Sequence, residues 1–310
     1  MGSILTLRRP ALLLAPTSTN HPEKERQKRL LQPFEDLPVW YQDNPFVRSA
    51  YRPVSSSTLS CLLSLSFLHN ETVNIYTHLI PAILSISAQV TLQSLISQHF
   101  PEASIRDRSI FALNLVAATT SLALSCGYHT LMNHSYKVSS LWLRIDYVGI
   151  LILILGSFFS GIFVGFYCEP SLQRLYWSMI ITLSLISSVL VLHPRLQGLK
   201  YRSLRTTAFI ATSLSGFAPV GHGLWLYGWD EMRIRSGMLY WFVEGVVYGV
   251  GAFFFMSRFP ESAWPGKFDI WFSSHQIFHV LVVLAGCVHL LGVWKAYEWN
   301  YQNNQCAVAS

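Results

Sequence analysis

The hydrophobic positions along the chain gather into long uncharged blocks that short polar stretches separate. Residues 145–168 hold one charged side chain in 24, and residues 175–193 hold none. A helix needs ~20 residues to cross a hydrocarbon core of ~30 Å, so such blocks are long enough to span a membrane. Strands of a membrane barrel would alternate apolar and polar positions instead. The pattern predicts an all-α, polytopic membrane protein with seven transmembrane helices at about 75–95, 109–131, 145–166, 174–193, 206–228, 237–256 and 273–294.

The segments on either side of the predicted bundle, residues 75–294, differ from it in pattern. Residues 1–45 contain the run KERQKR and several prolines with little periodicity, so we expect a mostly disordered, basic cytosolic segment. Residues 46–74 form a juxtamembrane segment in which mixed serines and leucines predict an amphipathic interfacial helix at about 56–68. Residues 295–310 are expected to form a short extracytosolic tail.

Composition and charge fit this picture and orient the protein. The chain is 51% hydrophobic and 12% charged, whereas a soluble domain has about 25% charged residues. Its net charge of +6 reports orientation rather than nucleic-acid binding, because lysine and arginine favour the cytosolic side of a membrane. Of the 22 lysines and arginines, 16 lie in the N-terminal segment and in the second, fourth and sixth connections. We therefore expect a protein of the plasma membrane or the endoplasmic reticulum whose N-terminus faces the cytosol.

The five cysteines, by contrast, show no paired spacing. This predicts neither a disulfide framework nor a thiolate metal site.

Four polar side chains fall at one level of the predicted bundle, near its cytosolic face. His129 ends the second span, Asp146 begins the third, and His275 and His279 begin the seventh. Spacing of four residues puts His275 and His279 on one helix face, and Ser125 lies one turn before His129. Three imidazoles and a carboxylate in a dry bundle are typical of a metal site, and three imidazoles suit Zn²⁺ while leaving a fourth position for water. Asp146 would then be a direct ligand or, as we favour because a catalytic site keeps the fourth position open, would hold or deprotonate that water. Ser125 would orient an imidazole or a substrate carbonyl.

The competing interpretation is that each histidine merely bonds a neighbouring helix, and it is the one we favour for His222 and His289. Glu244, within the sixth span, either pairs with a polar neighbour or touches a ligand headgroup.

A further polar group, Glu71, Asn74 and His78, shares one face at the start of the first span. These three residues either support the metal site or cap the span and tie it to a neighbour, and we favour the structural role.

Three motifs, in order along the chain, carry a family resemblance. They are ETVNIYTHL (71–79), SCGYHT (125–130) with LRIDYVGI (143–150), and PGKFDIWFSSHQIFHVLVV (265–283). With them the sequence resembles the progestin and adiponectin receptor family, also called the haemolysin-III-like proteins, and in particular its zinc-regulated fungal members. The resemblance covers about residues 40–294. One departure is Tyr76, where the family commonly has tryptophan.

The resemblance implies seven helices with a cytosolic N-terminus, Zn²⁺ on His129, His275 and His279, and Asp146 positioning the water. Family members are similar to ceramidases, which hydrolyse the amide of a lipid held between helices, and fungal members are linked to zinc and sterol homeostasis.

The main functional hypothesis is therefore a zinc-dependent intramembrane hydrolase acting on a ceramide-like lipid amide, with Asp146 accepting a proton and Ser125 donating to the developing oxyanion. One alternative is a receptor or regulator in which zinc is structural and the N-terminal segment contacts a cytosolic signalling partner. Another is the same site acting on a different lipid, such as an isoprenoid. A zinc transporter is less favoured, because no chain of acids crosses the bundle. Self-association into a homo-oligomer is left open, and no nucleic-acid partner is expected.

Overall fold

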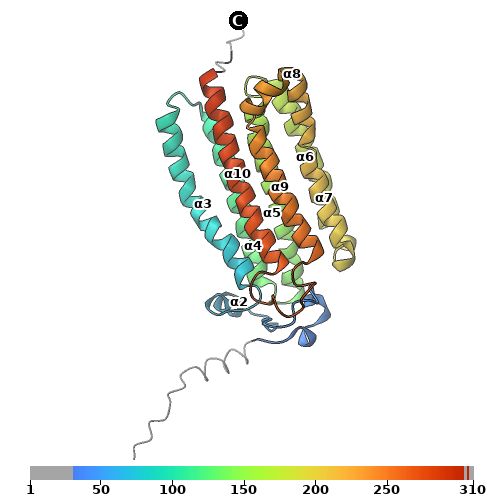
Figure 1. The fold of residues 1–310 in the computed structure, drawn as a ribbon. Helices are drawn as coiled ribbons and strands as arrows, with labels where there is room; N and C mark the ends of the chain where they lie inside the picture. Colours follow the sequence, from blue (N-terminus) through green and yellow to red (C-terminus); the bar gives the residue numbers. More distant parts are fainter. Residues whose placement is uncertain (1–30, 304–305, 307–310) are drawn as a thin grey trace, which may run out of the picture.

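The apolar blocks form long helices that run side by side as a bundle (Figure 1). The structure is a computed structural model that describes residues 31–303 and residue 306. Within these described residues, six helices are long and apolar enough to cross a membrane: α3 (Thr72–His99), α4 (Ile105–Leu131), α5 (Tyr136–Gly165), α6 (Pro170–Leu192), α9 (Met238–Ser257) and α10 (Ser274–Asn303). The predicted all-α, polytopic membrane fold is thereby confirmed.

The fifth predicted span, 206–228, is not one continuous helix. It is divided into α7 (Arg202–Leu214) and α8 (Phe217–Arg235), and Gly228 within α8 has a positive φ of 70°. Pro219 explains the break between the two helices. It has no N–H to donate, and its ring would clash with the carbonyl of Ser215, so the regular helical hydrogen bonding is interrupted at this point.

One end of the bundle is covered by the segment before α3, residues 31–70, which we call the cap (Figure 1). It contains the short helices η1 (Phe34–Asp36), η2 (Val39–Tyr41), α2 (Thr58–Leu63) and η3 (Ser64–Ser66). Leu37, Tyr41, Val47 and Tyr51 form a buried cluster with Met132 at the end of α4. The expectation of little structure before residue 45 is therefore wrong for residues 31–45, because their aromatic and aliphatic side chains pack on the bundle. The rest of that predicted segment lies outside the described residues.

Hydrogen bonds fasten the cap to the connection between α9 and α10. The Asn44 side chain donates to Glu261 Oε1 at 3.0 Å, while Arg48 N and Ser49 Oγ donate to the two carboxylate oxygens of Asp269 at 3.0 and 2.6 Å. Glu261 is fully buried and also accepts from the backbone N–H of Ser274, the first residue of α10, at 2.7 Å. The cap and the start of α10 are consequently held in one arrangement.

The opposite end of the bundle has its own core and a covalent link. Phe111, Phe163 and Tyr297, from α4, α5 and α10, are buried together there. The last helix continues to Asn303, so most of the expected tail 295–310 is helical where it is described. Cys168, after α5, forms a disulfide with Cys306. The prediction of no disulfide is wrong at this pair, since the two cysteines are 138 residues apart and only the folded bundle brings them together.

Candidate metal centre

Three histidines from two distant parts of the chain meet beneath the cap. His129 lies in the last turn of α4, and His275 and His279 lie in the first two turns of α10. Their ring centroids are 4.7 to 5.0 Å apart. Each residue offers one ligand atom, and these atoms all lie within 4.8 Å of one another. The structure thus brings together the three residues that the sequence analysis selected as metal ligands, in a group that could hold a metal ion.

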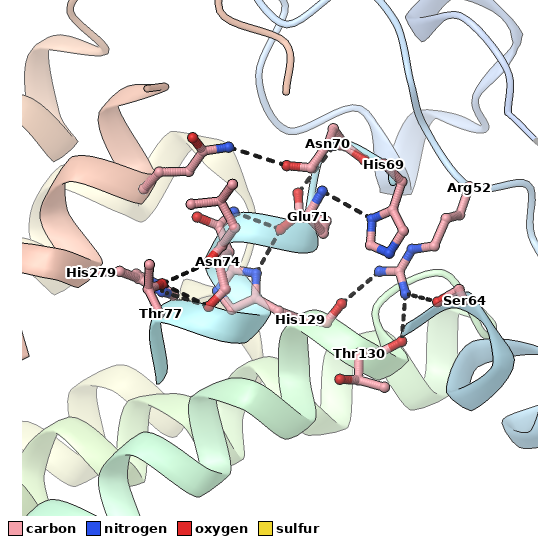
Figure 2. A network of polar contacts seen from close by, with 12 residues as sticks. Arg52, Ser64, His69, Asn70, Glu71, Asn74, Thr77, His129, Thr130 and His279 are labelled. Atoms are coloured by element: carbon pink, nitrogen blue, oxygen red, sulfur yellow. Dashed lines mark hydrogen bonds and ion pairs between the residues drawn. The ribbon is translucent and has the colours of Figure 1, made fainter. Parts of the chain in front are cut away.

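The hydrogen bonds of His129 leave one nitrogen of its ring facing this group. Its Nδ1 lies 2.7 Å from Glu71 Oε2, so the Nδ1–H donates to the carboxylate (Figure 2). Its Nε2 is buried and has no hydrogen-bond partner. An imidazole that donates from one nitrogen carries its lone pair on the other, which is the form that binds a metal. A buried nitrogen without a partner is costly, and a metal ion would satisfy it.

His279 is oriented in the same way by the backbone of α3. Its Nδ1 lies 3.0 Å from the carbonyl oxygen of Asn74, to which the Nδ1–H donates (Figure 2). The other ring nitrogen is then left as the ligand atom. Hydrogen bonds of this kind fix the tautomer and the ring orientation of metal-binding histidines. The donor set and its surroundings therefore fit a metal ion that imidazole nitrogens can bind.

Glu71, which immediately precedes α3, is itself held in place by several groups. It accepts hydrogen bonds from Asn74 Nδ2 at 2.7 Å and from Asn70 Nδ2 at 3.1 Å (Figure 2). Its backbone N–H donates to His69 Nδ1 at 3.1 Å, and burial lowers the pKa of His69 to about 3, which keeps that ring neutral. Burial alone would raise the pKa of Glu71, but hydrogen bonds from His129 and Asn74 lower it to about 2. The side chain is therefore a carboxylate.

Arg52 of the cap fixes the end of α4 that carries His129. Its guanidinium donates to the carbonyl oxygens of His129 at 2.6 Å and Thr130 at 2.9 Å, and to Ser64 Oγ at 2.8 Å (Figure 2). The side chain is only 1% exposed. The last carbonyls of a helix have no partner within the helix, and a cation there also interacts favourably with the helix dipole. In the sequence, Arg52 is only one of the basic residues of the N-terminal segment that indicate a cytosolic side. Nothing in the pattern indicates that the cap folds back onto α4.

Asp146 and Ser125 lie beside the histidines. Ser125 is buried on α4, one turn before His129. Asp146, on α5, interacts electrostatically with His129 and contacts the Ser125 side chain. Among the described residues, the group of potential ligand atoms contains the three histidines and not Asp146. The aspartate is thus positioned next to the candidate centre rather than within its ligand set.

His78 contacts the centre from α3. Its ring stacks on that of His279, with centroids 3.7 Å apart and an interplanar angle of 4°. Both nitrogens of His78 are buried and without a hydrogen-bond partner. The sequence analysis favoured a capping or tying role for Glu71, Asn74 and His78. The structure places all three against the histidines, because α3 begins between α4 and α10.

Three other polar residues of the spans, His222, His289 and Glu244, pair with neighbouring helices. His222 Nδ1 lies 2.8 Å from the hydroxyl of Tyr176, and His289 Nδ1 lies 2.8 Å from Glu244 Oε2. Both histidines thus make the interhelical contacts predicted for them. Of the two alternatives for Glu244, the structure supports pairing with a polar neighbour.

Comparison with known proteins gives one family match and several relatives. A family described as "Haemolysin-III related" matches residues 66–290. The chain is 34% identical to ADIPOR-like receptor IZH2 of Saccharomyces cerevisiae over 285 residues, which cover 91% of this chain and 90% of the yeast protein. It is 34% identical to an adiponectin receptor protein of Drosophila melanogaster, covering 89% of this chain but only 61% of the fly protein. It is 32% identical to heptahelical transmembrane protein 3 of Arabidopsis thaliana, covering 92% of each chain.

Proposed function

This chain belongs to the haemolysin-III-related family, and from that premise we propose that its three-histidine centre binds Zn²⁺ and hydrolyses the amide bond of a membrane lipid, such as a ceramide. The observation that carries the proposal is the arrangement at His129. Its Nδ1–H is fixed by a buried carboxylate, while its unpartnered Nε2 faces His275 and His279 on another helix. Histidines that only formed hydrogen bonds between helices would not need the second ring nitrogen of His129 to be left without a partner.

When bound, zinc supplies a Lewis acid that polarises a carbonyl and lowers the pKa of water to about 7. Side chains and backbone groups of the protein hold the ligands, accept the proton and bind the carbonyl oxygen. Glu71 and the Asn74 carbonyl hold the rings of His129 and His279 in place. Asp146 accepts the proton of the attacking water, and Ser125 donates a hydrogen bond to the amide carbonyl oxygen as negative charge develops on it. Asp146 passes that proton to the amide nitrogen, and the carbon–nitrogen bond then breaks to give a fatty acid and an amine.

The position of the cap supports substrate entry from the membrane. Buried cap residues, among them Arg52 and His69, cover the centre at that end of the bundle. An acyl chain would therefore approach between helices. Of the two ends of the bundle, we assign the cap end to the cytosol, because the N-terminal segment and the connections on that side carry 16 of the 22 basic residues. The disulfide at the opposite end supports this orientation, since such bonds persist in oxidising compartments.

The decisive experiment separates metal binding from turnover. Purified protein in nanodiscs would be assayed for zinc content and for hydrolysis of a panel of lipid amides and isoprenoid esters. Asp146→Asn should retain zinc and lose hydrolysis by at least about 100-fold, in line with the range for a general base. Unchanged hydrolysis by this variant would reject the role of Asp146.

A second candidate function is a receptor with structural zinc, which the names of the yeast and fly relatives favour. It predicts that the wild-type protein binds zinc but hydrolyses no member of the panel. It also predicts that replacing His275 lowers the zinc content and the thermal stability of the protein together.

A further inference from the structure

A second polar cluster, with three buried residues and the partly buried Glu244, lies in the bundle away from the three histidines. It consists of Asn114 on α4, Ser160 on α5, Glu244 on α9 and His289 on α10, and we call it the four-helix network. His289 Nδ1 lies 2.8 Å from Glu244 Oε2, His289 Nε2 lies 2.9 Å from Ser160 Oγ, and Asn114 Nδ2 donates to Ser160 Oγ at 3.1 Å. His289 follows His279 by ten residues, or ~15 Å along α10 at 1.5 Å per residue. The network is therefore separate from the candidate metal centre.

The hydrogen bonds of this network are complete when His289 is neutral. Its Nδ1–H then donates to Glu244, and its Nε2 accepts the hydroxyl proton of Ser160. Ser160 Oγ in turn accepts from Asn114. In this state the network carries the single negative charge of Glu244. Ser160 is 1% exposed, so the arrangement cannot serve as a serine nucleophile with a general base, because a substrate would have no access to the hydroxyl.

The hydrogen bonds are equally complete when His289 carries a second proton. Both ring N–H groups then donate, one to Glu244 and one to Ser160 Oγ. The Ser160 hydroxyl turns to the carbonyl oxygen of Gly156, which lies 3.0 Å away on the same helix. A hydroxyl has one donor and two acceptor positions, so Ser160 can keep its bond from Asn114 in both states. Adding the proton breaks no contact and rotates only one hydroxyl.

The two states differ in charge, and this difference favours uptake of the proton. With neutral His289 the network places a net negative charge in an apolar bundle. With the second proton it holds an ion pair with no net charge. A net charge in a low-dielectric interior is costly, whereas a paired and hydrogen-bonded one is tolerated. Imidazole is also the side chain that ordinarily changes charge between pH 5 and 8.

Among the residues that the structure describes around the network, no other group ordinarily changes charge in the same range. On α9, Tyr248 interacts with Glu244, and on α10 the neighbour of Tyr248 is Cys287. Phenols and thiols ordinarily titrate above this range. The facing groups of α4 and α5 are Asn114 and Ser160, which do not titrate, and the groove where α3 meets Leu290 is lined by aliphatic, serine and threonine side chains. On α8, Arg235 is paired with Glu231 at the end of the bundle.

We propose that the four-helix network is an intramembrane proton-binding site, in which His289 takes up one exchangeable proton against Glu244. The ligand is a proton, and the site joins α5, α9 and α10 in both states. It goes beyond the proposed hydrolase, since it shares no residue with the metal centre.

The test reads the protonation state of His289 directly. Protein labelled with ¹⁵N-histidine would be studied in nanodiscs by NMR between pH 5.5 and 8, and His289→Gln would identify the ring signals. We expect wild-type His289 to show both nitrogens protonated at pH 5.5 and to lose that signature by pH 8. In Glu244→Gln, which keeps the shape but removes the charge, the doubly protonated signature should be lost at pH 5.5 as well.

Ser160→Ala provides a second variant in case Glu244→Gln does not fold. It retains the ion pair, so the doubly protonated form should persist. It removes the hydroxyl that donates to Nε2 of the neutral ring and accepts from Nε2–H of the protonated ring, so the pH at which His289 changes state should shift measurably from that of the wild type. His222→Gln, at a histidine that bonds a tyrosine instead of a carboxylate, is the matched control and should leave the His289 signals unchanged.

A His289 that stays in one protonation state over the whole range in the wild type would overturn the proposal. So would a pH response that Glu244→Gln leaves unaltered. Zinc content, measured on the same samples, should be equal in wild type and Glu244→Gln. Failure of the proton site is therefore distinguishable from failure of the proposed hydrolase.

Discussion

Replacing Glu71 with alanine should weaken zinc binding by about 10- to 100-fold, the usual effect of removing a carboxylate that supports a metal-binding histidine. The carboxylate accepts hydrogen bonds from His129 and Asn74, both at 2.7 Å, and from Asn70 at 3.1 Å. Its loss frees the His129 ring to rotate and leaves three buried donors without their acceptor. Since tenfold in affinity corresponds to about 1.4 kcal/mol, the expected loss is about 1.4 to 2.8 kcal/mol of binding free energy.

The assay is a zinc competition titration of the purified protein in nanodiscs against a chelator of known affinity. Thermal unfolding of each variant shows whether the bundle is intact. Glu71→Gln should have a smaller effect, within about tenfold, because the amide oxygen can still accept from His129 while its NH₂ faces Asn70. Glu244→Gln is a matched control, since Glu244 also bonds a histidine at 2.8 Å but lies outside the centre.

Zinc affinity equal to that of the wild type in a folded Glu71→Ala protein would refute this reasoning. It would mean that the bond between Glu71 and His129 does not determine which nitrogen of the ring is presented to the metal.

Three further predictions concern the cap, the disulfide and pH. Arg52→Met should lower the free energy of unfolding by about 3 kcal/mol, because the carbonyls of His129 and Thr130 lose a charged donor. The control Arg48→Met, at a half-exposed residue, should lower it by less than about 1 kcal/mol. Equal effects of the two substitutions in denaturation experiments would contradict the role of Arg52. Cys306→Ser should make Cys168 reactive to a membrane-impermeant maleimide added from the extracytosolic side, whereas labelling of the wild type to the same extent would exclude the disulfide. Because the pKa of Glu71 is lowered to about 2, its stabilising effect should be complete above pH ~4.5 and lost as the pH falls toward 2. The thermal stability of metal-free wild-type protein should therefore decrease over this pH range, whereas that of Glu71→Gln should not.

The sequence was sufficient for the fold class because the constraint of a membrane is strong and local. A long apolar block with a single charged side chain, such as residues 145–168, has few structures open to it other than a membrane-spanning helix. The prediction of one continuous helix per apolar block failed where the helical hydrogen bonding of the backbone is interrupted. The block at 206–228 is apolar enough to suggest one span, but Pro219 interrupts its hydrogen bonding and divides it into α7 and α8.

The grouping of the three histidines could be predicted because spans alternate in direction, which places the end of the second span and the start of the seventh at one membrane level. This alternation alone was enough to predict that His129 and His275 lie near each other. The supporting residues could not be placed in the same way. Arg52 and Glu71 reach the centre because the cap folds against the ends of α4 and α10, and that packing depends on contacts between residues far apart in sequence. The same is true of Cys168 and Cys306.

The candidate ligands come from α4 and from α10, the last helix of the described bundle, and this has a consequence for biosynthesis. A ribosome-bound chain that has released only α3 to α9 presents one of the three imidazoles. The full set comes into existence only when α10 has entered the membrane and packed against its neighbours. Occupancy of the centre would therefore distinguish mature molecules from unfinished ones, and a cell could use loading with metal to sort the two.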